Sequence, residues 1–154
     1  MKGKRITVIL ALYFVGVTMS FGQSPFMGTW KLNEAKSKFA PGMPKNSTVI
    51  YATEGVDMKV TVDGTDNAGN ATHNEWTGKF DGKDYPVTGD PTSDSRAYKR
   101  KGIHELDFTA KKGMTVTTSG RIVVSDDGKT RTVTSRGTDS HGKKFKGTAV
   151  YDLQ

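Results

Sequence analysis

The chain has 154 residues, with 23 basic and 16 acidic side chains, a formal net charge of +7 and no cysteine. This length suits one domain with one hydrophobic core, and the missing cysteines exclude disulfides, thiol catalysis and thiolate metal sites. The basic residues form no dense stripe interleaved with aromatic side chains, so the composition does not indicate a nucleic-acid-binding protein.

The chain opens with the layout of a secretory signal peptide. A basic start over 1–5 precedes an apolar stretch over 6–19, and Ser20 and Gly22 then place small residues at a cleavage site before Gln23. The apolar stretch has 14 residues, whereas a membrane-spanning helix needs about 20. We therefore expect cleavage between Gly22 and Gln23 rather than a retained anchor.

Residues 23–154 then form the predicted exported domain, after a signal peptide over 1–22. The signal holds three basic residues and no acidic ones, so the net charge of the domain falls from +7 to +4. We expect the domain to reach the periplasm or the extracellular medium, with no stable membrane insertion after cleavage. No nucleic-acid partner is expected.

Strand and turn patterns alternate along this domain. Met58, Val60 and Val62 alternate with polar residues, a period of two that is typical of a strand with one buried face. The only helical turn predicted spans 34–39. The predicted strands begin near these residues: Met27, Ser47, Val56, Ala71, Asp84, Ser95, Ile103, Met114, Thr130 and Lys143.

Glycine pairs punctuate these runs, because glycine tolerates the positive φ of tight hairpin turns. Gly120, inside the run over 114–125, is interpreted as a bulge or a bend. The pairs predicted to form turns are Asp63-Gly64, Asp81-Gly82, Lys101-Gly102, Lys112-Gly113, Asp127-Gly128 and His141-Gly142.

The connections are too short for crossover helices, which argues against a parallel α/β sheet. A long meander leaves two unpaired edges, and closure into a barrel removes them. We predict an all-β fold, a single antiparallel up-and-down β-barrel of about ten strands with a short helical turn after the first strand. A β-sandwich would fit the same pattern, but the sequential hairpins favour the barrel.

The segment Phe26-Met27-Gly28-Thr29-Trp30-Lys31-Leu32 resembles the Gly-x-Trp opening strand of the calycin superfamily, the lipocalins and fatty-acid-binding proteins. The resemblance implies that Trp30 plugs one end of a barrel and that Gly28 lets the chain pass close to a neighbour. The whole pattern is similar to that of small exported bacterial lipocalin-like proteins.

The chain also departs from that superfamily. Fatty-acid-binding proteins carry an Arg-x-Tyr clamp for the ligand carboxylate on the last strand, but the matching residues here are Ala149-Val150-Tyr151. A lone phenol does not replace a bidentate guanidinium. The connection over 33–46 is too short for a two-helix lid, and the lipocalin Thr-Asp-Tyr turn is absent because Ser140 follows Thr138-Asp139.

No catalytic or metal-binding pattern emerges from the polar residues. His73 and Glu75 could clamp a metal, but they share the face opposite Trp76 and are expected to face solvent, whereas His104 has inward parity. No Gly-x-Ser-x-Gly elbow surrounds a serine, and Asp126-Asp127 lacks the spacing of a calcium loop. We expect no metal and no cofactor, and an enzyme is the least favoured of three alternatives.

The leading hypothesis is a non-enzymatic, exported lipocalin-like barrel, monomeric, that binds a small and largely apolar ligand. The second is a filled barrel that acts through its outer surface, as an inhibitor or an envelope interaction protein. The predicted ligand-binding residues are Trp76, Tyr98, Phe108 and Tyr151. They belong to a predicted inward-facing set of Met58, Val60, Trp76, Phe80, Tyr98, Leu106, Phe108, Met114, Ile122 and Tyr151.

Overall fold

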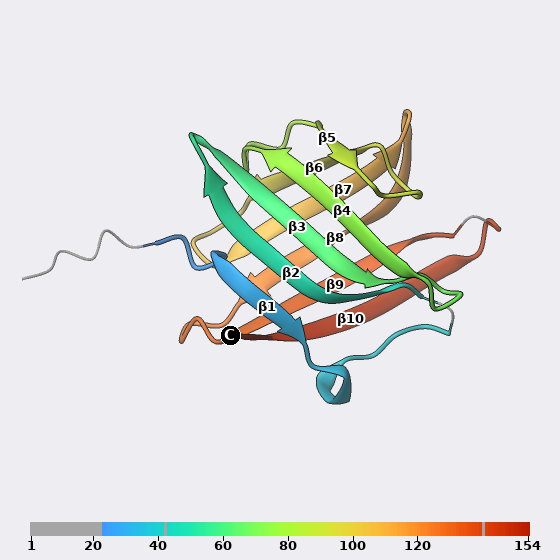
Figure 1. Cartoon of the computed structure of the whole chain (residues 1–154), viewed down its shortest axis with the longest axis horizontal. Coiled ribbons are helices and arrows are strands. Elements are labelled where there is room, and N and C mark those ends of the chain that lie inside the picture. Colours follow the sequence, from blue (N-terminus) through green and yellow to red (C-terminus); the bar gives the residue numbers. More distant parts are fainter. Residues whose placement is uncertain (1–22, 42, 140) are drawn as a thin grey trace, which may run out of the picture.

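The computed structural model describes residues 23–41, 43–139 and 141–154, so the predicted signal peptide lies outside the described residues. The described chain forms one closed barrel of antiparallel strands (Figure 1). Its elements are β1 (Gly28–Leu32), the 3-10 helix η1 (Glu34–Lys36), β2 (Lys45–Glu54), β3 (Asp57–Thr65), β4 (Ala71–Gly78), β5 (Tyr85–Thr88), β6 (Ser95–Arg100), β7 (Glu105–Lys112), β8 (Thr115–Val124), β9 (Thr130–Thr138) and β10 (Lys144–Leu153).

Each strand pairs with its neighbours in chain order, and β1 closes the barrel by pairing with β10. In that closing pair Trp30 lies opposite Leu153 and Leu32 lies opposite Tyr151. The predicted all-β up-and-down barrel is therefore confirmed, and the β-sandwich alternative is wrong. Every predicted strand start lies within two residues of the observed one.

Antiparallel order sends the connections alternately to the two ends of the barrel. The N-terminal segment, the C-terminus and the β2–β3 turn lie at one end (Figure 1). We call it the plugged end, because buried aromatic residues fill it. The opposite end, which we call the open end, carries the β3–β4, β5–β6, β7–β8 and β9–β10 connections.

Aromatic side chains fill the plugged end. Phe26 and Trp30 are fully buried, and the indole Nε1 of Trp30 donates to the Phe26 carbonyl oxygen at 2.8 Å. Phe26 also packs edge-on against Phe80, with the ring centroids 6.0 Å apart. The guanidinium of Arg100 lies over both phenylalanine rings, 5.5 Å and 5.7 Å from their centroids. Trp30 thus lies where the calycin resemblance implies.

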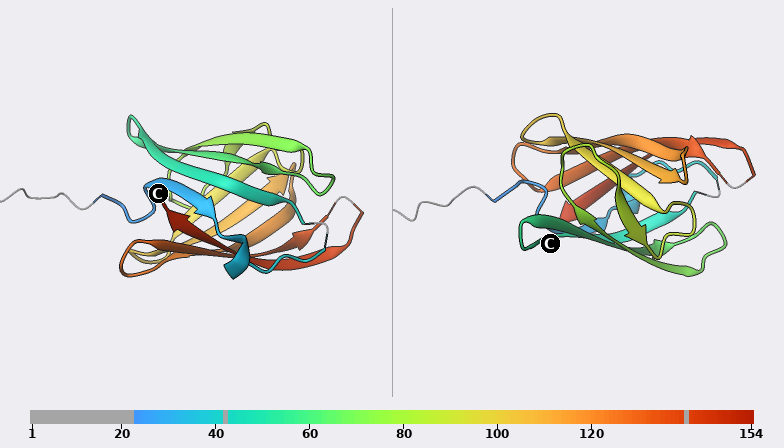
Figure 2. Two further views of the ribbon diagram at one scale, coloured as in Figure 1. Left: turned by 60° about the horizontal axis from the view of Figure 1, so that its bottom comes forward. Right: turned by 90° about the horizontal axis from the view of Figure 1, so that it is seen from above.

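The helix η1 is shorter than the turn predicted over 34–39. Asn33 caps its N-terminus by accepting from the Lys36 amide at 3.2 Å, and the chain is extended again from Ser37. The reason is a competing partner, because the backbone of Lys38 pairs with that of Thr148 on β10. The connection then continues to the open end, where β2 begins (Figure 2).

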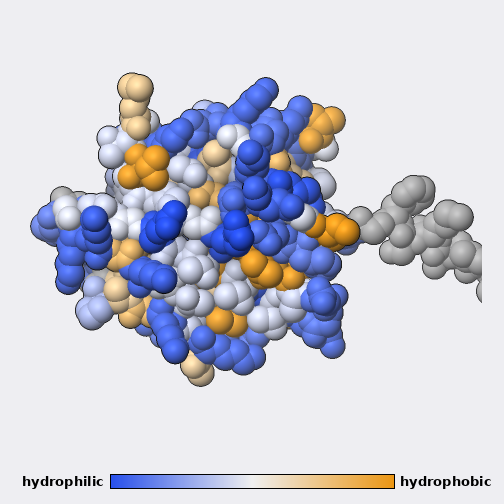
Figure 3. Space-filling view, turned by 180° about the vertical axis from the view of Figure 1, so that it is seen from behind, coloured by the Kyte–Doolittle hydropathy of each residue, from blue (hydrophilic) through white to orange (hydrophobic). Residues whose placement is uncertain are grey.

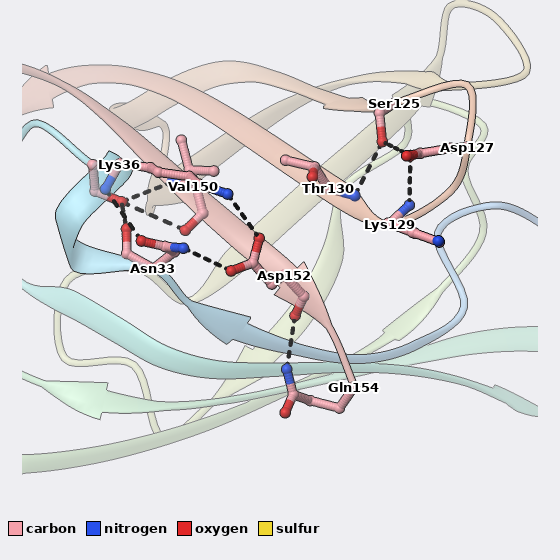
Figure 4. A network of polar contacts seen from close by, with 10 residues as sticks. Asn33, Lys36, Ser125, Asp127, Lys129, Thr130, Val150, Asp152 and Gln154 are labelled. Atoms are coloured by element: carbon pink, nitrogen blue, oxygen red, sulfur yellow. Dashed lines mark hydrogen bonds and ion pairs between the residues drawn. The ribbon is translucent and has the colours of Figure 1, made fainter.

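A polar network fastens the start of this connection to β10. The side-chain nitrogen Nδ2 of Asn33 donates to the Asp152 carboxylate at 2.7 Å, and Nζ of Lys36 lies 3.6 Å from the same carboxylate (Figure 4). The Ser37 hydroxyl accepts from the Val150 amide at 2.9 Å. These bonds hold the first connection along the edge of β10, in continuation of the β1–β10 pairing.

The predicted turn at Asp63-Gly64 is wrong, because Gly64 lies inside β3. The turn comes later, where the Asp66 carboxylate accepts from the amides of Ala68 and Asn70 at 2.8 Å and 2.9 Å. A Cβ on Gly64 would collide with the backbone of Lys45. This glycine therefore permits a close approach between strands rather than a turn.

Two predictions for β8 are also wrong. Gly120 is no bulge, since it pairs regularly with Phe108 and Ser135; the irregular register lies beside Ala110 instead. A Cβ on Gly120 would lie 2.7 Å from the Phe108 ring, so the glycine makes room for that ring. Met114, predicted to face inward, is 99% exposed in the β7–β8 turn, where the strand has not yet begun.

Candidate functional site

Three of the four predicted ligand-binding residues form one aromatic cluster inside the barrel. The ring centroids of Trp76 and Tyr98 are 4.8 Å apart, and those of Tyr98 and Phe108 are 6.3 Å apart. Trp76 and Tyr98 are buried, and Phe108 is half-buried. The indole Nε1 of Trp76 donates to the Arg96 carbonyl oxygen at 2.8 Å, so its polar atom is satisfied by the wall of the barrel. The inward parity predicted for these three residues is confirmed.

The fourth predicted residue, Tyr151, is buried on β10 and lies beside a residue that the sequence analysis missed. Tyr151 is directly opposite Arg131 on β9. The Arg131 guanidinium lies 4.8 Å from the Tyr151 ring centroid and 5.2 Å from that of Tyr51 on β2. It donates from Nη2 to the Tyr51 hydroxyl at 2.9 Å. Arg131, Tyr51 and Tyr151 therefore form one buried cluster.

The charge of Arg131 has no counter-charge among the described residues. Its side chain is buried, and Nε and Nη1 have no hydrogen-bond acceptor in the described part of the chain. Burial raises the pKa of the Tyr51 and Tyr151 phenols, against the opposing effect of Arg131. Both phenols therefore stay protonated near neutral pH and do not neutralise the guanidinium.

A second inward-facing arginine, Arg96 on β6, is half-buried and has an acidic partner. Its Nη2 lies 3.2 Å from the Asp90 carboxylate and donates to the Asn74 side-chain oxygen at 3.3 Å. Its Nη1 donates to the Tyr98 hydroxyl at 3.5 Å. Asp90 belongs to the β5–β6 loop, so this network ties the open end to the aromatic cluster.

Along the inner face of β8, β9 and β10, the size and the burial of the side chains decrease from the plugged end to the open end. Towards the plugged end its residues are large and buried: Ile122, Val124, Arg131 and Tyr151. Towards the open end its residues are mostly small and only half-buried: Thr118, Gly120, Val133, Ser135, Gly137 and Ala149. Solvent therefore reaches the inner wall in the open half, directly beside Phe108, which faces Gly120 across the β7–β8 pair.

Two hollows lie outside this inner wall. One of about 520 Å³ lies on the rim of the open end, between the β3–β4 turn and the β5–β6 loop, and Asp66, His73 and Asp90 help to line it. Another, of about 290 Å³, lies over β8–β10 and is lined in part by Val116, Arg136 and Lys144. Neither is an enclosed apolar cavity.

The histidines lie as their parity predicts. His73 is exposed, with Nδ1 2.6 Å from the Asp63 carboxylate and Nε2 3.6 Å from that of Glu75. The bond to Asp63 raises the pKa of His73. Nδ1 of His104 is buried and has no partner among the described residues. Within the described ranges, no group of three or more His, Asp or Glu side chains could hold a metal ion.

Membrane-spanning helices are also absent from the described ranges, where no helix has the length and the apolar composition to cross a bilayer.

Comparison with solved structures returns β-barrels of low sequence similarity. One is EF1p2_mFAP2b bound to DFHBI, which is 11% identical, covers 84% of this chain and 94% of its own, and has a TM-score of 0.47. Another is a redesigned β-barrel, mFAP1, bound to DFHBI, with 14% identity, coverage of 83% and 94%, and a TM-score of 0.43. Neither a scan against protein-family models nor a search of curated proteins finds a match.

Proposed function

We propose that this protein is an exported, non-enzymatic, calycin-like barrel that binds one small, largely apolar molecule in the open half of its interior. The observation that carries the proposal is the half-buried inner wall of β8–β10 beside Phe108. Small residues such as Ala149 and Ser135 lie on this wall, and the rings of Phe108 and Phe145 lie over its glycines, Gly120 and Gly137. An apolar wall with a few polar groups is the usual composition of a small-molecule site.

The size of the barrel supports the same proposal. An eight-stranded barrel has an interior just wide enough to be filled by its own side chains or to hold one small ligand, and the diameter grows with strand number. This barrel has ten strands. Its bulky residues gather towards the plugged end, which leaves the small ones at the open end to face a ligand.

Export is supported by the first described residues. The Met27 amide donates to the Ser24 carbonyl oxygen at 3.0 Å, and Phe26 is fully buried. Residues directly after the predicted cleavage site before Gln23 thus already take part in the packing of the plugged end, as a mature domain that starts at Gln23 requires.

A neutral fluorescent probe tests the proposal. We expect 1-aminoanthracene to bind the purified exported protein saturably, with one site per chain. Ser135→Phe places a large ring on the half-buried inner wall and should weaken binding at least tenfold. Thr134→Phe, on the exposed outer face of the same strand, is the matched control and should bind normally. If no member of a panel of neutral lipophilic probes binds and no ligand co-purifies, the proposal is wrong.

The alternative role, a filled barrel acting through its outer surface, has one specific observation in its favour. Met114 is 99% exposed and Val116 is 50% exposed at the β7–β8 hairpin, beside the hollow over β8–β10. The outer face seen in Figure 3 is otherwise largely hydrophilic, with separate apolar spots. A photo-crosslinker at position 114 that captures one specific envelope protein, with capture lost when Val116 is changed to Ser, would favour this role.

A further inference from the structure

The last three strands of the barrel carry mostly positive charge. Three of their basic residues, Arg136, Lys144 and Lys146, are exposed on the outer face in the half of the barrel next to the open end. The single acidic residue of these strands, Asp152, lies near the plugged end. In chain order, their charged residues are Arg121, Arg131, Arg136, Lys144, Lys146 and Asp152.

The three exposed cations lie close together. Arg136 is directly opposite Lys146 on β10 and Ser119 on β8. The Cβ atoms of such opposite residues are about 5 Å apart, and like charges at these positions are destabilising. Lys144 lies two residues from Lys146 on the same face, a spacing of about 7 Å along a strand. These three residues, which we call the basic cluster, therefore repel one another unless an anion lies among them.

No side chain of the described ranges neutralises the basic cluster. None of its three members forms an ion pair there, whereas Arg121, on the outer face of β8, contacts both Glu105 and Asp107 at 2.8 Å. The nearest carboxylate along the chain is that of Asp139, and it accepts from amides of the β9–β10 turn at 2.9 Å. The positive charge of the basic cluster is thus left to solvent or to a ligand.

A hollow of about 290 Å³ lies beside the basic cluster. Nε of Arg136 is 3.5 Å from the Ser119 hydroxyl, its one hydrogen bond among the described residues. Hydroxyl groups on this lining can donate to an anion, and Val116, which is 50% exposed, offers apolar surface. The lining includes Arg136, Lys144, Ser119, Thr138, Val116 and Phe145. The hollow therefore combines cations, hydroxyl donors and an apolar border.

We propose that the basic cluster is an anion-binding site for the phosphate group of a phosphomonoester. Such a group carries about 1.5 to 2 negative charges at pH 7, so it neutralises more of the cluster than a single carboxylate would. The planar guanidinium of Arg136 suits bidentate contact with phosphate oxygens, and Lys144 and Lys146 add point charges. An apolar part of the ligand would lie against Val116 and Phe145. Because this site is on the outer face, it is separate from the ligand proposed for the interior and does not depend on it.

NMR titration of the wild-type exported protein tests the site without a variant. We expect phenyl phosphate at pH 7 to shift the amide signals of Ser119, Arg136 and Lys146 most, and saturably. Inorganic phosphate should shift the same signals with at least threefold weaker affinity, because it lacks the apolar part. Sodium chloride at the same ionic strength should leave these signals nearly unchanged. Shifts spread equally over the basic residues of the surface, Arg121 included, would overturn the site.

A charge-matched pair of variants locates the binding. Arg136→Gln should weaken the affinity for phenyl phosphate at least fivefold. Arg121→Gln removes the same charge from the same outer face, but that guanidinium already has two carboxylate partners, so this variant should bind within twofold of the wild type. Melting temperatures would verify that both variants fold. An equal loss in the two variants would show a diffuse effect of net charge and would overturn the site.

Vesicle flotation distinguishes a lipid headgroup from a soluble ligand. Phosphatidic acid carries a phosphomonoester, and vesicles of phosphatidylcholine with phosphatidic acid would be compared with vesicles of phosphatidylcholine alone. Flotation of the wild type with the first kind only, lost in Arg136→Gln, would identify a lipid source. Binding of phenyl phosphate without flotation would identify a soluble phosphomonoester. If phenyl phosphate, inorganic phosphate and the phosphatidic acid vesicles all fail to bind, the proposed site is wrong.

Discussion

Arg131 and Arg96 lie in the same barrel interior but in different electrostatic surroundings. Arg96 has the Asp90 carboxylate, the Asn74 amide and the Tyr98 hydroxyl as partners. Arg131 instead has the Tyr51 hydroxyl, the Tyr151 phenol and the two tyrosine rings beside it. Its buried charge is therefore balanced by no carboxylate among the described residues.

Arg131→Met should raise the free energy of unfolding by about 1–2 kcal/mol, because replacing buried charge with a well-packed apolar side chain is often stabilising. Urea denaturation at pH 7 without ligand measures this. Arg136→Met, on the outer face, is the control and should change stability by less than about 0.5 kcal/mol. A marked loss of stability in Arg131→Met would show that the protein itself satisfies the guanidinium.

Gly120→Ala tests the close packing of the inner wall. The new methyl would lie 2.7 Å from the Phe108 ring and would also crowd the Thr134 carbonyl oxygen. Overpacking of this kind typically costs about 1–3 kcal/mol, so the urea midpoint should fall. Gly102→Ala is the matched control, because a Cβ there meets nothing closer than 3.9 Å. An unchanged urea midpoint for Gly120→Ala would mean that the Phe108 ring and the Thr134 backbone shift to accept the methyl at little cost.

Among the elements, β5 forms the weakest part of the wall. It pairs with β4 at only two positions and with β6 at only two. The loop that follows is fastened by side chains instead. The Asp90 carboxylate accepts from the hydroxyls of Ser93 and Thr92 at 2.5 Å and 2.7 Å and also holds Arg96.

This loop should make the barrel sensitive to acid. Burial alone would raise the pKa of Asp90, but the bonds from Ser93 and Thr92 and the charge of Arg96 together hold it below its usual value. The ionised carboxylate therefore stabilises the fold above the unfolded pKa near 3.9, and that contribution is lost as the pH falls through the lower folded-state pKa.

We expect Asp90→Asn to lower the free energy of unfolding by about 1–3 kcal/mol at pH 7. Between about pH 4 and pH 2 the difference from the wild type should shrink, because the wild-type carboxylate is then protonated as well. Urea titrations at pH 7 and pH 3 measure both values. A difference that stays constant with pH would show that the charge of Asp90 is unimportant.

The strands were the elements most predictable from the sequence. Alternating parity placed the strands because one face of each must be buried, and parity does not depend on distant residues. It failed at Gly64 and Gly120, because a glycine that makes room for Lys45 or Phe108 has the same local pattern as a glycine in a turn. It also failed at Met114, which the turn at Gly113 carries into solvent.

The candidate site was only partly predictable for a related reason. Trp76, Tyr98 and Phe108 were predictable because they are large, mainly apolar residues at inward-facing positions of their strands. Arg131 shares the parity of Val133 and Ser135, which was the available signal, but a charged residue on a strand is normally read as facing solvent. Only the register between β9 and β10 places it against Tyr151.

For the whole molecule, export is the prediction to check first. Expression of the full chain in a bacterium should yield a periplasmic or secreted protein whose mass corresponds to residues 23–154, with Gln23 at its N-terminus. Fractionation and intact mass spectrometry measure this, and Gly22→Leu, which removes the small residue at the cleavage site, should leave the precursor uncleaved. Full-length protein in the cytoplasmic fraction of the wild type would contradict the prediction.

Pairing of β1 with β10 sets the order in which the chain can acquire its structure. The partner strand of β1 lies more than a hundred residues later in the chain. Trp30 can therefore pair with Leu153 only after β10 has been synthesised and has folded onto the barrel. Such distant pairing slows folding to about milliseconds or seconds. Until then the edge of β1 stays exposed to other chains. In a chain exported N-terminus first, the barrel would therefore remain unclosed, and its strand edges accessible to a chaperone, until β10 (Lys144–Leu153) had left the export channel.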